Sequence, residues 1–388
     1  MDETDVAIIG AGIAGSAAAI ALARRGWQTV LIDRQQFPRH KVCGEFLSPE
    51  SLAMLEELTL LDEILDQTPA RIRQASLALH GQRELQLALP GTALGISRFF
   101  LDSALHRRAA DHGALIRTGV TASEVRQEGS RYVVELLGAA KSRIYARAVI
   151  VASGAYARSG LPGTSVRGEA TKRDRKRYFG IKSHLKGMAT GETVELYFWK
   201  GGYVGISPVE GGVMNAAGLL VHGEQAGAKG VLELLEHASR SNRQLQRRLE
   251  GAEPIPGTQA AVSPVLLGKR SSVWDGVALA GDAASVIPPL CGDGMSMALR
   301  SAALCAEQAD AYLAGRIDLL DWQRAYSSAI RQQLARPQRW GRILQWSLSQ
   351  SALTPFFRQA ALAAPFLAHR LVTATRLAPM PVGSGSSG

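Results

Sequence analysis

Three glycines near the N-terminus have the spacing of a dinucleotide-binding turn. Gly10, Gly12 and Gly15 follow an apolar run at residues 6–9 and precede an alanine-rich stretch. In such a turn the first glycine permits the tight bend, the second lets the backbone approach a pyrophosphate, and the third lets a helix pack closely on the strand. The free N–H groups at the start of that helix favour phosphate groups.

Asp33 lies where the second strand of this unit is expected to end. The pattern predicts a helix over residues 16–25, closed by Gly26 in the position that glycine favours after a helix, and a strand over residues 28–32. An acidic residue there can accept hydrogen bonds from an adenosine ribose. The complete unit therefore predicts a bound dinucleotide, although by itself it does not choose between NAD and FAD.

A second glycine-rich segment lies far along the chain. Residues 276–280 are typical of a short apolar strand, which runs into Gly281-Asp282 and then, after a turn rich in proline and glycine, into a helix expected from Met295 to about residue 314. Together with the N-terminal unit, this segment resembles the second FAD signature of the p-hydroxybenzoate hydroxylase-type flavoproteins. That group includes aromatic monooxygenases, flavin halogenases and geranylgeranyl reductases.

The resemblance assigns roles to the residues of this segment. It implies that Asp282 binds the ribityl chain and that Pro289 lies beside the isoalloxazine ring. The N–H groups of Gly292, Gly294 and Met295 would point at the pyrimidine edge of the flavin. A helix N-terminus there favours the negative charge that develops on a reduced flavin.

Two further segments support this resemblance. Arg98, which precedes a helix expected over residues 101–112, is similar to the family's arginine that reaches the FAD phosphates and ribityl chain. Asp102 would lie in the first turn of that helix, where an acid is favourable. The strand at residues 148–152, followed by Gly154, is similar to the segment that returns the chain to the cofactor.

The loop at residues 37–49 resembles the FPR–x–K–x–CGE region of the geranylgeranyl reductase-like branch, and it is also similar to the corresponding loop of some flavin halogenases. The resemblance implies that Cys43, Gly44 and Glu45 lie near the reactive face of the flavin. The thiol of Cys43 could tune the flavin or form a covalent link, but a free cysteine is more often a small buried hydrophobe. Lys41 and Arg39 are expected to contact phosphate or carboxylate groups.

The complete set of expected FAD contacts follows from these segments. It comprises Gly10, Gly12, Ala14, Gly15, Asp33, Arg34, Lys41, Cys43, Gly44, Arg98, Gly154, Gly281, Asp282, Pro289, Gly292, Gly294 and Met295. No metal site is expected, because the three cysteines show no CxxC spacing.

The middle of the chain is typical of short strands with glycine turns. Strands are expected near residues 76–89, 178–186, 193–199, 202–209 and 212–220. The family resemblance implies that this antiparallel sheet covers one flavin face. Alternation places about half of its side chains toward the flavin. His184, Trp199 and Tyr203 are candidates there, with sheet-core packing as the alternative for the aromatic residues. These three residues, together with Cys43 and Glu45, are the candidates for catalysis. The sequence assigns no catalytic role to any of them.

These patterns predict an α/β fold with a discontinuous FAD-binding domain. That Rossmann-like domain is expected over residues 1–75, 98–165 and 270–320. An α+β substrate domain with an antiparallel sheet is expected over residues 76–97 and 166–269. A helical cap broken at Pro337, Pro355 and Pro365 follows over residues 321–382, and residues 383–388 are typical of a linker or tag remnant.

The net charge of +10 is concentrated toward the C-terminus. Beyond Asp321 the sequence has no acidic residue and eight arginines: Arg324, Arg331, Arg336, Arg339, Arg342, Arg358, Arg370 and Arg376. No nucleic-acid-binding motif accompanies this charge, so nucleic acid is excluded as a partner. A solvated helix face is the plain interpretation, and peripheral contact of these helices with an anionic membrane is the alternative.

A second basic run, at residues 172–177, is either a solvated loop or a docking site for a phosphate-bearing partner such as an acyl carrier protein or CoA. The acidic N-terminus, the small number of cysteines and the absence of a basic leader predict a cytoplasmic location.

The first functional expectation is an FAD-dependent monooxygenase. It would hydroxylate an apolar or aromatic substrate of secondary metabolism, either free or bound to a carrier, through a flavin C4a-hydroperoxide. The alternative is a reductase or dehydrogenase of the geranylgeranyl reductase type, acting on carbon–carbon bonds. A flavin halogenase is a third possibility, but residues 202–208 depart from the WxWxIP motif expected of one. No second GxGxxG is present, so NADPH or NADH would bind transiently, or a separate reductase would supply the electrons.

Overall fold

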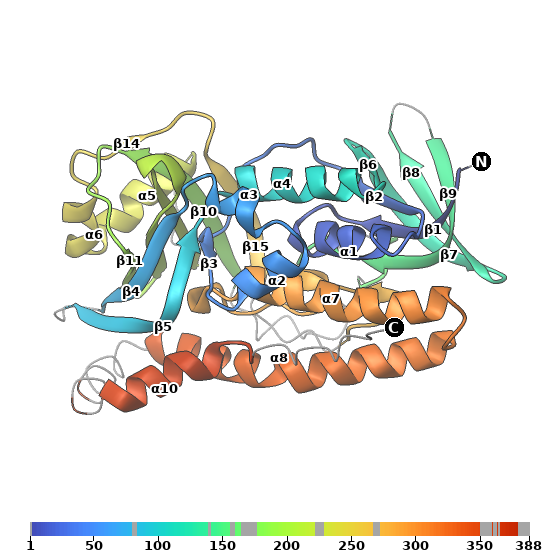
Figure 1. Ribbon diagram of the computed structural model, residues 1–388. Coiled ribbons are helices and arrows are strands. Elements are labelled where there is room, and N and C mark those ends of the chain that lie inside the picture. Colours follow the sequence, from blue (N-terminus) through green and yellow to red (C-terminus); the bar gives the residue numbers. More distant parts are fainter. Residues whose placement is uncertain are drawn as a thin grey trace.

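The computed structural model describes residues 2–79, 84–138, 141–155, 160–163, 177–221, 229–266, 272–349, 359, 363 and 365–378. Most of the basic run at residues 172–177 lies outside these residues. Figure 1 shows two sheets side by side, with long helices running beneath both of them.

The first sheet carries the N-terminal βαβ unit. Its strand order is β6-β2-β1-β9-β8-β7, and β16 also pairs with β9. The central strands are parallel, while β7 and β8 form an antiparallel extension. The strands are β1 Asp2–Ile9, β2 Thr29–Asp33, β6 Leu115–Thr118, β7 Thr121–Glu128, β8 Arg131–Leu137, β9 Lys141–Val151 and β16 Ala278–Leu279.

Both faces of β1 are buried, which explains its continuous apolar run. Val6 and Ile8 pack against three helices, whereas Ala7 and Ile9 belong to a second apolar cluster with side chains of β8 and β9. The three helices are α1 Ile13–Ala23, α4 Arg98–Asp111 and α7 Gly294–Leu313. Each lies where the sequence predicts a helix, with ends that differ by one to three residues.

The second sheet is largely antiparallel, with order β14-β10-β13-β12-β11-β4-β5-β3 and with β15 also paired to β10. Only β4 and β11 run parallel among its described pairs. The strands are β3 Phe46–Leu47, β4 Ala70–Ala78, β5 Leu85–Gly95, β10 Arg177–Lys186, β11 Thr193–Trp199, β12 Gly202–Pro208, β13 Met214–Val221, β14 Glu253–Pro254 and β15 Ala260–Leu266.

Two strands of the second sheet come from residues that the sequence analysis assigns to the FAD-binding domain. β3 and the beginning of β4 lie within residues 1–75. The loop at residues 37–49 therefore links the two sheets directly. Helices α5 Val231–Arg240 and α6 Arg243–Arg248 follow the central strands, while α2 Ser51–Glu57 and α3 Leu61–Leu65 connect β3 to β4.

The C-terminal helices differ from the expected broken cap at one proline. Helix α8, Leu319–Ser349, continues through Pro337. A proline inside a helix removes one hydrogen bond and bends the helix. Here the apolar side chains of Ile330, Leu334 and Leu348 are buried on both sides of it, which holds the two halves together. Pro365 instead begins α10, Pro365–Thr375, where proline is well tolerated. Pro355 is not among the described residues.

Within the described ranges, the helices are too short or too polar to cross a bilayer. Helix α8 lies under α7, and α10 lies beneath β5 (Figure 1). The described C-terminal helices α8 and α10 therefore lie below the two sheets.

Candidate active site

Two glycines of the N-terminal turn, Gly10 and Gly15, have no room for a side chain. Gly10 has a φ of +107°, and a Cβ atom there would lie 2.4 Å from the carbonyl oxygen of Ala152. A Cβ atom on Gly15 would lie 1.8 Å from the carbonyl oxygen of Gly10. Helix α1 then begins at Ile13, and its N-cap Gly12 makes no side-chain cap. The first N–H groups of α1 are therefore available to a phosphate.

Asp33 is held at this turn by its own carboxylate. Oδ2 accepts a hydrogen bond from the N–H of Ala11 at 2.8 Å, and Oδ1 accepts one from the N–H of Gln35 at 2.8 Å. A small cavity beside it is lined by Gly10, Asp33, Arg34 and Ser153, among others. Ser153 Oγ is buried there without a hydrogen-bond partner. These polar groups lie where the sequence predicts the adenosine end of the cofactor, and Ser153, which precedes Gly154, was not among the residues that the sequence analysis expected there.

Arg98 lies beside the second glycine of the turn. Its guanidinium donates to both carboxylate oxygens of Asp102 at 2.8 Å, and both side chains are buried. Burial acts to lower the pKa of Arg98, but the charge of Asp102 outweighs it and the pKa is raised. A Cβ atom on Gly12 would lie 3.7 Å from Arg98 Nη2. A permanently charged donor is thus placed beside the phosphate position.

The distant glycine-rich segment meets this turn in space. A Cβ atom on Gly281 would lie 2.8 Å from the Cβ atom of Ala14. Lys41 is within electrostatic range of Asp282 and Arg98, and burial lowers the pKa of its ammonium group. The expected phosphate and ribityl contacts, which come from four parts of the chain, therefore surround one region.

The start of α7 lies against the loop at residues 37–49. Gly292 has a φ of +71°, and a Cβ atom there would lie 2.7 Å from the ring of Phe46. The N-cap residue Asp293 makes no side-chain cap; it is buried and pairs with Arg376. Burial raises the pKa of Asp293 to about 7, against the effect of Arg376. The N–H groups that follow are free to meet the edge of a flavin ring. In the sequence Arg376 was noted only as one of the C-terminal arginines, with no link to this segment.

Glu45 is the most constrained residue of this loop. Its backbone has a φ of +54°, a left-handed conformation that is costly for a residue with a side chain and that is found most often at functional sites. Cys43 lies just before it: the Cys43 carbonyl oxygen accepts from Asn215 Nδ2 at 3.0 Å, and Sγ accepts from the Glu45 N–H at 3.4 Å. The loop is therefore tied to β13.

The carboxylate of Glu45 is surrounded by three donors. Oε1 accepts from Lys182 Nζ at 2.6 Å and from the N–H of Arg98 at 2.9 Å. Oε2 lies 2.6 Å from His184 Nε2. Glu45 and Lys182 are 0% exposed and His184 is 6% exposed. Burial acts to raise the pKa of Glu45, but the hydrogen bond with His184 and the charge of Lys182 outweigh it and lower the pKa.

His40 completes this group, which we call the acid–base cluster (Glu45, Lys182, His184 and His40). Its Nδ1 lies 3.1 Å from Lys182 Nζ, and its ring stacks on Phe99. Burial, together with the charges of Lys182 and His184, lowers the pKa of His40 from 6.5 to about 4. His40 is therefore neutral near pH 7, so Nδ1 accepts a hydrogen bond from the lysine. His40 is partly exposed and leads from the buried cluster toward solvent.

The depressed pKa of His40 makes stability depend on pH. Between pH 6.5 and about pH 4 the unfolded chain binds a proton that the folded protein does not, so the free energy of unfolding falls as the pH falls through this window. We expect His40→Gln, which keeps an acceptor for Lys182, to lose less Tm than the wild type between pH 7 and pH 5. Thermal unfolding at both pH values measures this, and an unchanged pH dependence would contradict it.

Strand alternation separates the catalytic candidates of the second sheet. Lys182 and His184 share one face of β10, and the strand register places Tyr203 of β12 on the same face. Trp199 points to the opposite face, where it packs in a cluster with Leu234 of α5. The structure thus brings His184 and Tyr203 to the cofactor side and leaves Trp199 away from it. Lys182 was not among the residues that the sequence analysis expected at the site. It could have been found from its position two residues before His184, which places both side chains on the same face of a strand.

The sheet face that carries Lys182 and His184 also carries a group of apolar side chains, which we call the apolar layer. The apolar layer comprises residues that are all buried in one cluster: Leu77, Phe198, Tyr203, Leu219, Leu290 and Leu348. Leu290 comes from the turn before α7, and Leu348 comes from the end of α8. Burial raises the pKa of the Tyr203 hydroxyl, so it remains protonated. The layer offers an apolar environment next to the loop that approaches the flavin position.

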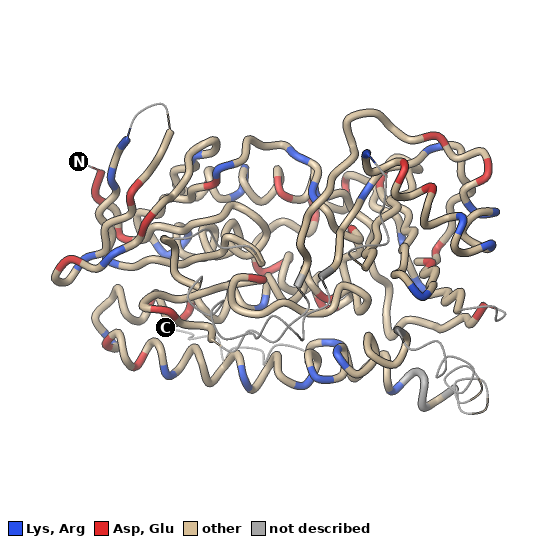
Figure 2. The backbone as a smooth tube through the Cα atoms, turned by 180° about the vertical axis from the view of Figure 1, so that it is seen from behind, with Lys and Arg blue, Asp and Glu red and all other residues tan. Residues whose placement is uncertain are grey.

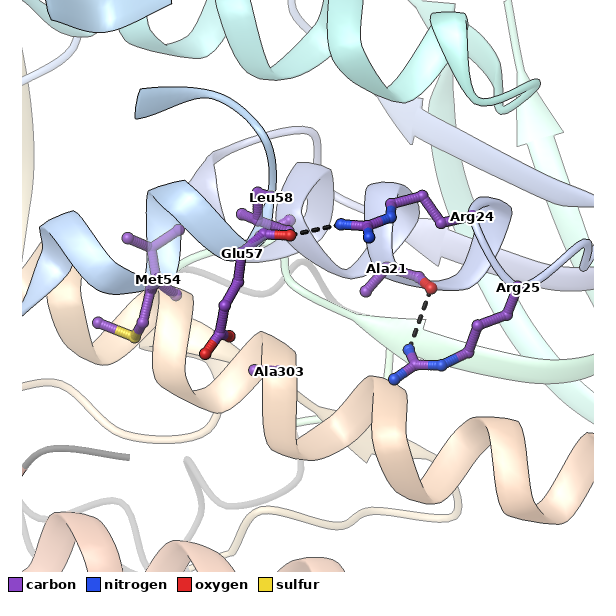
Figure 3. A pocket seen from close by; sticks show the side chains of 9 residues that line it. Ala21, Arg24, Arg25, Met54, Glu57, Leu58 and Ala303 are labelled. Atoms are coloured by element: carbon purple, nitrogen blue, oxygen red, sulfur yellow. Dashed lines mark hydrogen bonds between the residues drawn. The ribbon is translucent and has the colours of Figure 1, made fainter. Parts of the chain in front are cut away.

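A larger cavity of about 510 Å³ lies elsewhere, between α1, α2 and α7 (Figure 3). Met54 and Leu58 line it, and Arg24 and Arg25 close its rim by donating to the carbonyl oxygens of Glu57 and Ala21. It contains none of the residues expected to contact FAD, and its arginines are already used by backbone acceptors. We assign it no part in the chemistry.

The close contact at Gly15 yields a direct test of the cofactor site. Gly15→Ala places a methyl group where the carbonyl oxygen of Gly10 lies, so α1 must move away from the turn. We expect roughly a tenfold or greater loss of bound FAD, since helix and phosphate can no longer approach. The ratio of flavin to protein absorbance in the purified protein measures it. Gly230→Ala, in open space at the start of α5, is the matched control.

Comparison with known proteins supports FAD as the cofactor. The family model described as FAD binding domain matches residues 3–336. A menaquinone reductase of Mycobacterium tuberculosis is 31% identical over 333 residues, covering 80% of this chain and 77% of that protein. Digeranylgeranylglycerophospholipid reductase 2 of Methanopyrus kandleri is 27% identical, covering 79% of this chain and 77% of that protein.

Solved structures show the same fold. A flavin-dependent brominase superposes with a TM-score of 0.77 at 19% sequence identity, covering 96% of this chain and 94% of that one. The family model spans most of the chain, and it includes the glycine turn, Arg98 and the segment at residues 276–314. The chain therefore belongs to the FAD binding domain family and is an FAD-dependent oxidoreductase.

Proposed function

We propose that this protein is a reductase that adds two hydrogen atoms across a carbon–carbon double bond of a long apolar substrate. The observation that carries the proposal is the acid–base cluster. Its Glu45, Lys182 and His184 are buried, and both Lys182 and His184 lie on the sheet face that also carries Tyr203 of the apolar layer. The names of two similar proteins, a menaquinone reductase and a geranylgeranyl lipid reductase, refer to reductions of largely apolar molecules. Both names favour the reductase alternative over hydroxylation.

Reduction of a double bond needs a hydride for one carbon and a proton for the other. FAD, when bound and reduced, would supply the hydride, and NADPH or NADH is the proposed electron donor. The protein's part is to hold a proton in a place that water does not reach. Lys182 Nζ and His184 Nε2 both hold protons against the Glu45 carboxylate, and the neutral ring of His40 connects Lys182 with solvent for reloading.

The apolar layer orients the substrate in this proposal. A long hydrocarbon gains roughly 25 cal/mol per Å² of apolar surface that it buries, and it needs no polar contacts for this. The leucines and aromatic rings of the layer, which pack against one another in this structure, would have to separate to receive it. Arg98 links the two parts of the site, because its main-chain N–H holds Glu45 while its guanidinium lies at the phosphate turn.

An anaerobic turnover experiment tests the proposal. The purified holoenzyme is reduced by NADPH or NADH without oxygen and incubated with a geranylgeranyl lipid, and the products are analysed by mass spectrometry. We expect a product that has gained two hydrogen atoms. A product that appears only in air and carries an atom from labelled dioxygen would instead establish the monooxygenase that was first expected from the sequence.

A further inference from the structure

The outward face of α8 carries a row of four exposed basic side chains. Arg331, Arg336, Arg339 and Arg342 are all exposed, and their spacing of three to five residues keeps them on one side of the helix. Figure 2 shows this row as blue bands along the lower helix, where acidic residues occur only near its beginning. No acidic side chain pairs with these four arginines within the residues that the structure describes.

Large apolar side chains continue this row at its C-terminal end. Ile343 is 42% exposed and Trp346 is 60% exposed on α8, and Phe366 is 63% exposed on α10. The guanidinium of Arg370 lies over the ring of Phe366, with 4.5 Å to the ring centroid. The surface thus combines positive charge with exposed aromatic rings, a combination that is typical of helices that lie in a membrane interface.

The inward face of the same helix turns is buried. Leu344 and Leu348 pack with the apolar layer under the second sheet. The helix thus has an apolar face turned inward, and Ile343 and Trp346 are apolar residues exposed away from it. A cluster of exposed hydrophobic residues on a folded protein usually marks a surface that binds something.

We propose that the outer face of α8 and α10 docks on an anionic lipid bilayer. The arginines would lie at the phosphate headgroups, and Ile343, Trp346 and Phe366 would enter the headgroup boundary. A second copy of this chain fits the surface poorly, because it would bring the same row of positive charge against the first. An acidic protein would neutralise the arginines but would not require the exposed aromatic rings at the end of the row. The proposal does not rest on the proposed function.

Vesicle co-sedimentation of the full chain with FAD bound tests this docking. The probes are neutral phosphatidylcholine vesicles and vesicles in which about a third of the lipid is phosphatidylglycerol. We expect binding only to the anionic vesicles, and loss of that binding as the salt concentration rises from about 0.1 M to 1 M. Replacing Arg331, Arg336, Arg339 and Arg342 together by glutamine should weaken binding roughly a hundredfold or more.

A matched variant separates this surface from net charge alone. Replacing the exposed residues Arg71, Arg240, Arg243 and Arg247 by glutamine changes the net charge equally at other places on the molecule, and it should leave vesicle binding nearly unchanged. Equal loss in both variants, or equal binding to neutral vesicles, would overturn the proposal. A dimer in solution that Trp346→Ser and Phe366→Ser dissolve would overturn it in favour of a second copy.

Tryptophan fluorescence provides a second measurement, which needs only a single substitution. Anionic vesicles with brominated acyl chains should quench the tryptophan emission of the wild type, and Trp346→Phe should abolish most of that quenching. Quenching that persists unchanged in Trp346→Phe would place the membrane contact elsewhere and contradict the proposal.

Discussion

Replacing Glu45 by glutamine is expected to lower kcat for double-bond reduction by about 100- to 1,000-fold, the range typical of removing a positioned acid or base. The amide keeps the size of the side chain but no longer carries the charge that holds Lys182 and His184. Their protons are then no longer held in place beside the apolar layer. FAD content should stay near that of the wild type, because the glycine turn, Arg98 and Asp102 are unchanged.

Steady-state kinetics together with the flavin absorbance spectrum measure this effect. Glu56→Gln on α2, which is exposed and distant from the acid–base cluster, is the matched control and should retain full activity. A Glu45→Gln enzyme that keeps its kcat would remove the acid–base cluster from the mechanism. A variant that loses its FAD instead would assign Glu45 to cofactor binding.

Replacing Lys182 by methionine is expected to destabilise the fold by about 3–5 kcal/mol, the cost of leaving one partner of a buried ion pair unpaired. Methionine fills a similar volume, so packing loss contributes little. The Glu45 carboxylate stays at 0% exposure with only His184 and the Arg98 N–H as partners. Denaturant unfolding of the holoenzyme, with the midpoint and slope compared to those of the wild type, measures the difference.

The same strand offers a control for this prediction. Lys186→Met removes a lysine whose side chain is 62% exposed and which pairs with an exposed glutamate, Glu253. Its cost should stay below about 1 kcal/mol, since exposed ion pairs contribute little. The double variant Lys182→Met/Glu45→Gln should recover part of the stability that Lys182→Met loses. If Lys182→Met and Lys186→Met lower the free energy of unfolding by similar amounts, the prediction that the buried Lys182–Glu45 pair costs more to break than an exposed pair is wrong.

Local patterns in the sequence were sufficient for the cofactor-binding half of the protein. The GxGxxG spacing, the strand that ends in Asp33 and the segment at Gly281-Asp282 each have a physical reason that acts within about thirty residues: a tight turn, a close backbone approach or a helix end. The expected helices therefore appear as α1, α4 and α7, with small differences at their ends. Pro337 was misjudged because the packing of α8 on its neighbours outweighs the local cost of a proline.

The sequence by itself thus determined the FAD-binding unit, the loop at residues 37–49 and the location of the basic C-terminal helices. Only the tertiary structure decided what the candidate catalytic residues do, since their partners lie far away along the chain. Glu45 meets Lys182 and His184 across more than 130 positions, and Asp293 meets Arg376 across 83. Such contacts depend on how β3, β10 and α7 pack together. Alternation along a strand shows which residues share a face, but it does not show which of the two faces lies toward the cofactor. That choice of face is why His184 and Tyr203 lie at the site and Trp199 does not.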